Sequence, residues 1–231
     1  MDLMRYITAA QMKAIDRTAI EKYGVPASLL MENAGTAVAE EIFKTMKRGN
    51  VLVSAGYGNN GGDGFVIARL LLKKGFGVSV LLAGRPRPFS NETGNNFKAL
   101  LDAGCAPRAV YDIASTEKAF VGLTGYELIV DALFGIGIKG PLDRFYVALI
   151  EKINSSGAKI IAVDLPSGLD ADEGTPCPSA VRASKTVTFG LPKAGFKNEA
   201  SEPYTGEIIV ADIGIPSAAV DDVLMMAQKD I

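Results

Sequence analysis

The chain has 231 residues, of which 48% are hydrophobic and 22% charged, and its formal net charge is −2. This length suffices for one domain with a sizeable core. A charge so close to zero gives no electrostatic reason to expect nucleic acid or a membrane surface as a partner. The chain contains no histidine, which excludes Ser-His-Asp and Cys-His catalysis and every metal site with histidine ligands.

The two cysteines, Cys105 and Cys177, lie far apart and form no C-x-x-C pair. No segment is apolar over the length that a bilayer requires, and the charged N-terminus is not that of a signal peptide. We therefore expect a cytoplasmic protein that has no membrane association, no disulfide framework and no zinc knuckle.

Two helices are expected first along the chain. Thr8 and Gln11 form a capping box, which predicts a helix that ends near Gly24. Pro26 suits the first turn of a second helix, which we expect to run to about Met46.

A regular alternation of short apolar strands and helices follows. The pattern predicts strands at 51–55, 77–83, 107–111, 127–132, 159–163, 184–189 and 207–210, and helices at 63–74, 91–103, 115–121 and 142–154. Such alternation is typical of an α/β fold, here a three-layer, Rossmann-like, mostly parallel sheet with helices on both faces. We expect a single domain over residues 1–216, with residues 217–231 forming a tail, either a short helix or a linker.

The segment GYGNNG (56–61) has the G-x-G-x-x-G spacing of dinucleotide-binding loops. Two features argue against an ordinary dehydrogenase loop. The next strand ends in LLAGR (81–85), without the acid that holds a ribose, and Asp63 lies where a pyrophosphate would sit. Asn59, Asn60 and Asp63 offer oxygen atoms, which suit a hard cation or the polar groups of a ligand. The alternative is that Asp63 is only a helix N-cap after a tight turn.

Two further loops follow strands at the same expected edge of the sheet. In VDALFGIGIKGPLDRF (130–145), Asp131 ends a strand, and a glycine-rich turn with Lys139 leads to a helix whose first turn holds Pro141. This turn fits phosphate, unless it is only a flexible connection with a solvated lysine. In AVDLPSGLDADEGT (162–175), Asp164 leaves an apolar strand. It is a candidate for general acid–base work, unless it only starts an Asx-turn.

The three loops together resemble the YjeF N-terminal family, the NAD(P)H-hydrate epimerases. The resemblance extends from about residue 5 to about residue 216. It rests on the text GNNGGDGFVIAR (58–69), VDALFGIGIKG (130–140), VDLPSGLDADEG (163–174) and VTFGLPKAGF (187–196).

The resemblance implies an isomerase, NAD(P)H-hydrate epimerase, which interconverts the R and S epimers of C6-hydrated NADH and NADPH. A separate S-specific NAD(P)H-hydrate dehydratase would then repair the whole pool. A homodimer is implied as well, with a potassium ion held by Asn60, Asp131 and Ser167. The implied substrate-binding residues are Asn59, Asn60, Gly61, Gly62, Asp63, Gly135, Ile136, Gly137, Ile138, Lys139, Gly140, Pro141 and Asp164.

We hypothesise that Asp164 acts first as general acid and then as general base on the hydrated ring. The alternative is a non-catalytic nucleotide-binding or scaffold module of the same fold. An NAD-dependent oxidoreductase is a second rival, against which the missing ribose-binding acid argues. The family is often fused to a dehydratase domain, and we expect this sequence to be too short to include one.

Overall fold

The computed structural model of the protein describes residues 5–121 and 125–227. Its strands are β1 (Asn50–Ala55), β2 (Gly77–Ala83), β3 (Arg108–Val110), β4 (Leu128–Ala132), β5 (Lys159–Val163), β6 (Lys185–Phe189) and β7 (Glu207–Ala211). They form one sheet in the order β3-β2-β1-β4-β5-β6-β7, and all neighbouring strands are parallel. The predicted Rossmann-like α/β fold is confirmed, with a sheet that is parallel throughout the described residues.

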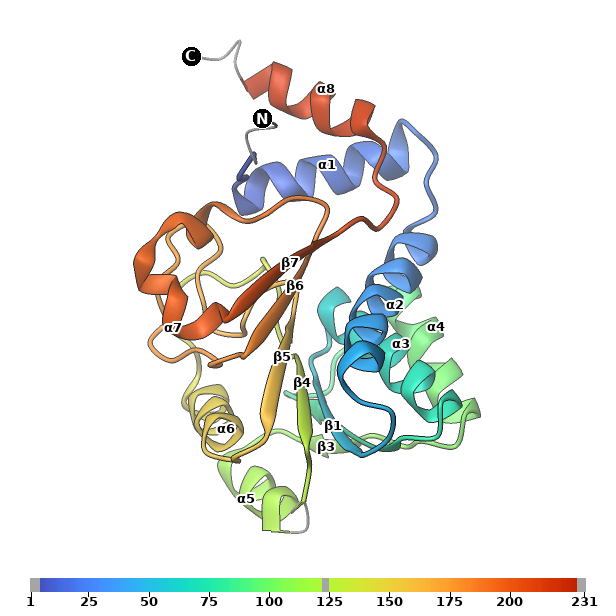
Figure 1. Cartoon of the computed structure of the whole chain (residues 1–231), viewed down its shortest axis with the longest axis vertical. Helices are drawn as coiled ribbons and strands as arrows, with labels where there is room; N and C mark the ends of the chain where they lie inside the picture. Colours follow the sequence, from blue (N-terminus) through green and yellow to red (C-terminus); the bar gives the residue numbers. More distant parts are fainter. Residues whose placement is uncertain (1–4, 122–124, 228–231) are drawn as a thin grey trace.

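Helices cover both faces of the sheet (Figure 1). One face packs against α2 (Ala27–Thr45), α3 (Asn59–Lys73) and α4 (Asn91–Asp102), and the other against α5 (Ile113–Val121) and α6 (Arg144–Asn154). The chain between β6 and β7 forms η1 (Ala194–Lys197), η2 (Glu199–Ser201) and α7 (Glu202–Thr205). No helix in the described part of the chain is long and apolar enough to cross a membrane.

The core consists of two apolar layers, one on each face of the sheet. In β1, Val51 and Val53 pack against α2 and α3, whereas Leu52 packs on the opposite side with α6. Successive side chains of a strand point to opposite faces. Because both faces are covered, both sets of positions are apolar, which explains the unbroken hydrophobic strands in the sequence.

Helices α1 (Ala9–Glu21) and α8 (Ser217–Ala227) lie side by side across one end of the sheet (Figure 1). The capping box predicted at Thr8 and Gln11 is present. The side chain of Lys22, which follows α1, lies 2.6 Å from Asp222 in α8. Residues 217–227, expected to be a short helix or a linker, therefore form a helix that packs on the rest of the fold.

The predicted start of α3 was wrong. We expected a loop up to residue 62, but α3 begins at Asn59, and Gly58 is its N-cap. Asp63 therefore lies one turn inside the helix, and the alternative that it is only an N-cap is wrong too. In the sequence, the glycines at 61, 62 and 64 are typical of a turn. In the structure they lie within α3 and allow this helix to pack closely against neighbouring segments. A Cβ atom at Gly61 would overlap the carbonyl oxygen of Gly56, and one at Gly64 would lie 2.7 Å from the Cβ of Ala132.

Helix α6 begins at Arg144, two residues later than the predicted start at residue 142. The reason is local, because the Asp143 carboxylate accepts a hydrogen bond from the N–H group of Phe145 at 2.8 Å and so caps the helix. Pro141, expected in the first turn of this helix, lies before the cap. The other predicted strands and helices are present, with boundaries that differ by a residue or two.

The close approach of α3 to β1 predicts a position-specific effect of alanine. We expect Gly61→Ala to lower the free energy of unfolding by at least about 2 kcal/mol, because backbone atoms must move to admit its Cβ. Gly58→Ala is the matched control, since no heavy atom lies within 4 Å of the Cβ position there. It should cost less than about 1 kcal/mol in urea unfolding. Equal losses in the two variants would contradict the close approach.

Candidate functional site

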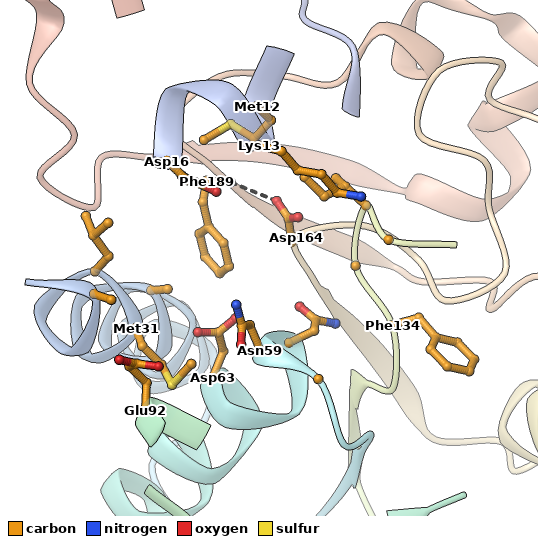
Figure 2. Close-up of a pocket in the computed structure, with 18 of the residues that line it drawn as sticks. Met12, Lys13, Asp16, Met31, Asn59, Asp63, Glu92, Phe134, Asp164 and Phe189 are labelled. Carbon is orange, nitrogen blue, oxygen red and sulfur yellow. Dashed lines mark hydrogen bonds between the residues drawn. The ribbon is translucent and has the colours of Figure 1, made fainter. Parts of the chain in front are cut away.

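A cavity of about 560 Å³ lies at the carboxyl ends of β1, β4 and β5. Strands β1 and β4 are neighbours from which the chain continues to opposite sides of the sheet. Open α/β sheets bind their ligands at such a point. In Figure 2, α1 lies above the cavity, whereas Met31 of α2 and Asp63 of α3 lie below it. The loop after β4, which carries Phe134, lies to the right, and Asp164 faces the cavity from the end of β5.

Most of the predicted substrate-binding residues line this cavity, but not all. Those that do are Asn59, Asn60, Asp63, Gly135, Ile136, Gly137, Ile138 and Asp164. Gly61, Gly62, Lys139, Gly140 and Pro141 are not among its lining residues. Lys139 points elsewhere, since its side chain is 73% exposed and its Nζ atom lies 3.5 Å from Asp172. The cations that do line the cavity are Lys13, Arg87 and Lys193, which sequence reasoning had not assigned to the site.

Asp164 adopts a backbone conformation that few residues adopt. Its φ angle is 65°, and among the described residues it is the sole non-glycine residue with a positive φ. Such a conformation is costly outside glycine and recurs at functional sites. The Asp164 N–H group donates to the carbonyl oxygen of Val187 at 2.8 Å, which ties the turn after β5 to strand β6. The turn directs the carboxyl group into the cavity (Figure 2).

One carboxylate oxygen of Asp164 is held by several donors. Oδ1 lies 2.7 Å from Nζ of Lys193, and accepts hydrogen bonds from the Thr188 hydroxyl at 3.2 Å and the Phe189 N–H at 3.3 Å. The residue is 9% exposed. Because its contacts come from β6 and the loop after it, the position of this carboxyl group depends on the packing of two neighbouring strands.

Lys193 is one of the cavity-lining residues that sequence reasoning missed. Its side chain is fully buried, and its Nζ atom also donates to the Thr188 hydroxyl at 2.9 Å and to the Phe189 carbonyl at 3.1 Å. A buried ammonium group needs such partners. The loop that carries Lys193 is held by Ile7, whose N–H donates to Pro192 and whose carbonyl accepts from Ala194. Its position four residues after the apolar strand β6, at the end of a parallel sheet, was the sequence signal that could have identified Lys193 as a site residue.

Three more side-chain carboxyl groups line the same cavity: Asp16 from α1, Asp63 from α3 and Glu92 from α4 (Figure 2). Burial raises the pKa of Asp16 to about 6, and the negative charge of Asp164 adds to this rise, while Lys193 opposes it. Burial also raises the pKa of Asp63 well above its usual value, with Asp164 and Asp16 adding to the effect. The cavity therefore holds two carboxyl groups whose pKa values burial raises, Asp16 and Asp63, beside a third, Asp164, that is ion-paired with a lysine. Such contrast suits acid–base chemistry.

Of the three residues predicted to hold potassium, Asn60 lines the cavity, whereas Asp131 and Ser167 do not line it but contact each other. The Ser167 hydroxyl and N–H donate to the two oxygens of Asp131 at 2.6 and 2.7 Å. Both residues are buried, and the Ser167 hydroxyl also lies 3.3 Å from the carbonyl oxygen of Phe134. Asn60 is not bonded to either residue within the described chain. Its Oδ1 atom lies instead, with Oδ2 of Asp164, beside the Cβ position of Gly135.

The donor set fits a monovalent cation. Burial raises the pKa of Asp131 to about 6, although hydrogen bonds from Ser167 and Leu133 lower it. In the described chain no lysine or arginine forms a salt bridge with this carboxylate, and no group of three or more acidic, histidine or cysteine side chains could hold a more highly charged metal. The buried Nδ2 atom of Asn60, a hydrogen-bond donor as placed, has no partner among the described residues. Carboxylate, hydroxyl and carbonyl oxygens around one uncompensated charge are ligands that a hard cation prefers.

Residues 27–195 match the family model described as "YjeF-related protein N-terminus". A protein of Limosilactobacillus fermentum named NAD(P)H-hydrate epimerase is 40% identical over 207 residues, which cover 89% of this chain and 95% of that protein. A bifunctional NAD(P)H-hydrate repair enzyme, Nnr, of Moorella thermoacetica is 39% identical over 221 residues. The alignment covers 94% of this chain but 42% of that enzyme, so this chain spans about two fifths of the bifunctional relative's length.

A solved structure has the same fold. The crystal structure of the yeast protein ynu0 superimposes with a TM-score of 0.81, covering 95% of this chain and 93% of that one, at 24% identity. The fold described above is therefore one that a crystal structure already represents.

The buried ion pair predicts a large effect of removing its lysine. We expect Lys193→Met to lower the free energy of unfolding by about 3–5 kcal/mol, because it leaves the Asp164 carboxylate buried without a cation. The surface variant Lys139→Met should cost less than about 1 kcal/mol. Adding Asp164→Asn to Lys193→Met should restore part of the loss, as urea unfolding of the single and double variants would measure. Strictly additive losses would contradict the coupling of the two side chains.

Proposed function

Because the chain belongs to the family of the YjeF-related protein N-terminus, we propose that it is an NAD(P)H-hydrate epimerase. Its substrate would be NADH or NADPH hydrated at C6 of the nicotinamide ring, and its reaction the interconversion of the R and S epimers. The observation that carries the proposal is Asp164. Its carboxyl group faces a cavity at the dinucleotide crevice of the sheet and is held there by Lys193.

The proposed reaction needs only proton transfer. A carboxylic acid at Asp164 gives its proton to the C6 hydroxyl group, the C6–O bond breaks, and water leaves as the lone pair of the ring nitrogen forms a planar iminium. Water then adds to C6, and a carboxylate takes the extra proton. Atoms and charge balance over the two steps, and no electron is transferred to or from the substrate. This agrees with the lack of a ribose-binding acid after β2, where the chain continues Gly84-Arg85.

The substrate would enter where a dinucleotide enters other Rossmann-like folds. The loop after β4 carries Gly135 and Gly137, which have no side chains to keep a ligand away from the backbone. At Gly137 the space that a Cβ atom would take is open, so a ligand can occupy it. Lys13 and Arg87 line the same cavity and supply positive charge for the pyrophosphate. We no longer assign that role to Lys139, because its side chain is exposed and lies beside Asp172.

We also propose a potassium ion bound through Asp131, Ser167 and Asn60. Bound potassium would supply a fixed positive charge beneath the cavity. The support is the buried carboxylate of Asp131, which forms no salt bridge in the described chain, together with the Nδ2 atom of Asn60, which has no hydrogen-bond partner there. An amide group can be placed either way round, and the flipped orientation turns its oxygen toward that unpartnered position.

We also propose that the protein is a homodimer. Apolar side chains are exposed on α8, among them Met225, which is 62% exposed, and Met226, which is 65% exposed. The fusion of two repair activities in the Moorella relative supports an S-specific dehydratase as functional partner. The free cysteines Cys105 and Cys177 agree with a reducing cytoplasm.

The proposed role of Asp164 predicts a separation of binding from turnover. We expect Asp164→Asn to lower the rate of epimer interconversion by a factor of about 10² to 10⁴, since the amide neither gives nor takes the proton. Binding of NADPH should change less than about tenfold, because the amide keeps the shape of the side chain. Chromatography of the two epimers and calorimetry of NADPH binding would measure these effects. A wild-type protein that binds NADPH but leaves the epimers unchanged would instead be a non-catalytic module.

The proposed potassium site predicts a pH-dependent stabilisation. The pKa of Asp131 is about 6 in the folded protein, against 3.8 for an ordinary aspartate. The ionised form is therefore disfavoured by folding, and stability falls as pH rises from about 4 to above 6. The difference of about 2 pKa units corresponds to about 3 kcal/mol.

Potassium should offset this loss, because it binds the ionised carboxylate. We expect potassium chloride to raise the melting temperature more at pH 7.5 than at pH 4.5, measured against tetramethylammonium chloride at equal ionic strength. Asp131→Asn should remove the stabilisation by potassium. It should also remove the part of the pH dependence of stability that titration of Asp131 causes. A potassium effect that is equal in the wild type and in Asp131→Asn would exclude this site.

A further inference from the structure

The proposed epimerisation passes through a nicotinamide ring that carries a positive charge, and the inference below rests on that function. The hydrated ring is neutral. Once the C6–O bond breaks, the lone pair of N1 forms the N1=C6 bond, and the positive charge spreads over both atoms. A group that attracts this cation more strongly than the neutral hydrate lowers the barrier. Asp164 cannot supply the whole attraction, because Nζ of Lys193 lies 2.7 Å from its Oδ1 atom and offsets its charge.

An aromatic side chain lines the cavity beside Asp164. Phe189 is the last residue of β6 and one of the residues that line the cavity. Figure 2 shows it on the same side of the cavity as Asp164, with its ring pointing inward toward Asp63. The face of an aromatic ring carries partial negative charge and attracts a cation placed over it. Phe189 therefore has the chemistry that the charged intermediate requires.

The backbone that holds the carboxyl group of Asp164 also holds this ring. The Phe189 N–H donates to Oδ1 of Asp164 at 3.3 Å, and the Phe189 carbonyl oxygen accepts from Nζ of Lys193 at 3.1 Å. Strand β7 holds the same residue from the other side, since Phe189 pairs with Ala211. The ring and the carboxyl group are thus fixed relative to each other, so that one substrate ring can meet both.

The ring of Phe189 lacks the contacts that occupy other aromatic rings of the protein. Within residues 5–121 and 125–227, no other aromatic ring stacks on it and no cation lies over it. Phe134 also lines the cavity. Its ring packs against Tyr146 instead, with the ring centroids 4.6 Å apart, and Figure 2 shows it pointing away from the cavity. Of these two aromatic residues, Phe189 is therefore the one that can meet a ligand.

We propose that the ring of Phe189 is the platform on which the hydrated nicotinamide ring lies, and that its π face stabilises the cationic form of that ring. Phe189 is then a catalytic residue that contacts the substrate but transfers no proton and no electron. In the first step the C6–O bond breaks, the oxygen leaves as water with the proton of Asp164, and the new positive charge faces the aromatic ring. In the second step water adds to C6, Asp164 takes the extra proton, and the ring becomes neutral again.

The alternative is that Phe189 only fills the core. It is 7% exposed and belongs to the same apolar layer as Val187 and Phe76. A residue that only fills the core contributes its shape and volume. Fluorine atoms on the ring leave the shape nearly unchanged but withdraw negative charge from its face. Stepwise fluorination therefore separates the two explanations.

The first experiment replaces Phe189 by phenylalanines that carry one, two and three ring fluorines. We expect kcat for epimer interconversion to fall stepwise, by about 10- to 100-fold over the series, because each fluorine weakens the attraction for the cation. KM should change less than about threefold, since the bound hydrate is neutral. The matched control is the same series at Phe76, which is buried in the same layer but does not line the cavity. It should change kcat less than about twofold.

The second experiment measures binding and needs no turnover. The nicotinamide ring of NADP⁺ is cationic, whereas that of NADPH is neutral. Phe189→Met keeps an adaptable apolar side chain but removes the π face. We expect this variant to weaken binding of NADP⁺ about 5- to 30-fold more than binding of NADPH, as calorimetry would measure. Phe76→Met should leave the ratio of the two affinities unchanged.

The outcomes separate failure of this inference from failure of the proposed function. If the wild type interconverts the epimers and kcat does not depend on fluorination of Phe189, the platform is wrong while the epimerase function stands. Equal losses of NADP⁺ and NADPH binding in Phe189→Met would also overturn the platform, because they would reflect lost shape alone. A wild type without interconversion would refute the function, and the binding ratio would still decide on the platform. If Phe189→Met unfolds, the fluorinated series decides instead, because it keeps the shape of the ring.

Discussion

The ion pair between Lys193 and Asp164 is the interaction on which the rest of the site depends. It places a buried ammonium group 2.7 Å from a carboxylate that stands at the end of β5 in a left-handed conformation. The lysine is held by the end of β6 and the loop after it, and that loop is held by Ile7 near the N-terminus. Three distant parts of the chain thus fix one carboxyl group. A buried charge pair is a costly way to gain stability, so its presence at a cavity favours a functional explanation.

The glycines before and within α3 serve the same arrangement from the other side. They let the helix start against β1 so closely that a side chain at Gly61 would overlap the backbone of Gly56. This brings Asn60 and Asp63 to the cavity from inside a helix. In a dehydrogenase the corresponding helix start meets a pyrophosphate. Here the acidic side chain one turn into the helix works against an anion, and the nearby cations come from Lys13 and Arg87 instead.

The fold was predictable from the sequence because its parts are local. Short apolar strands that alternate with helices allow few other architectures. The carboxyl ends of parallel strands then bring Asn60 and Asp164 together. The site residues that the sequence could not reveal are those whose position depends on how distant elements pack together. Lys193 is an ordinary lysine until β6 is placed beside β5, and Asp16 belongs to a helix whose position the strand pattern leaves open. Lys139, the cation that spacing favoured, lies beside Asp172 and away from the cavity.

The four aspartates in and beneath the cavity share a physical logic. Each is buried or half-buried, and their negative charges lie close enough for Asp164 to act on both Asp16 and Asp63. Among the described residues, one of the four, Asp164, is ion-paired to a lysine. For the other three, burial is the main cause that raises the pKa, so binding of a proton or a cation would offset the cost of burying each carboxylate.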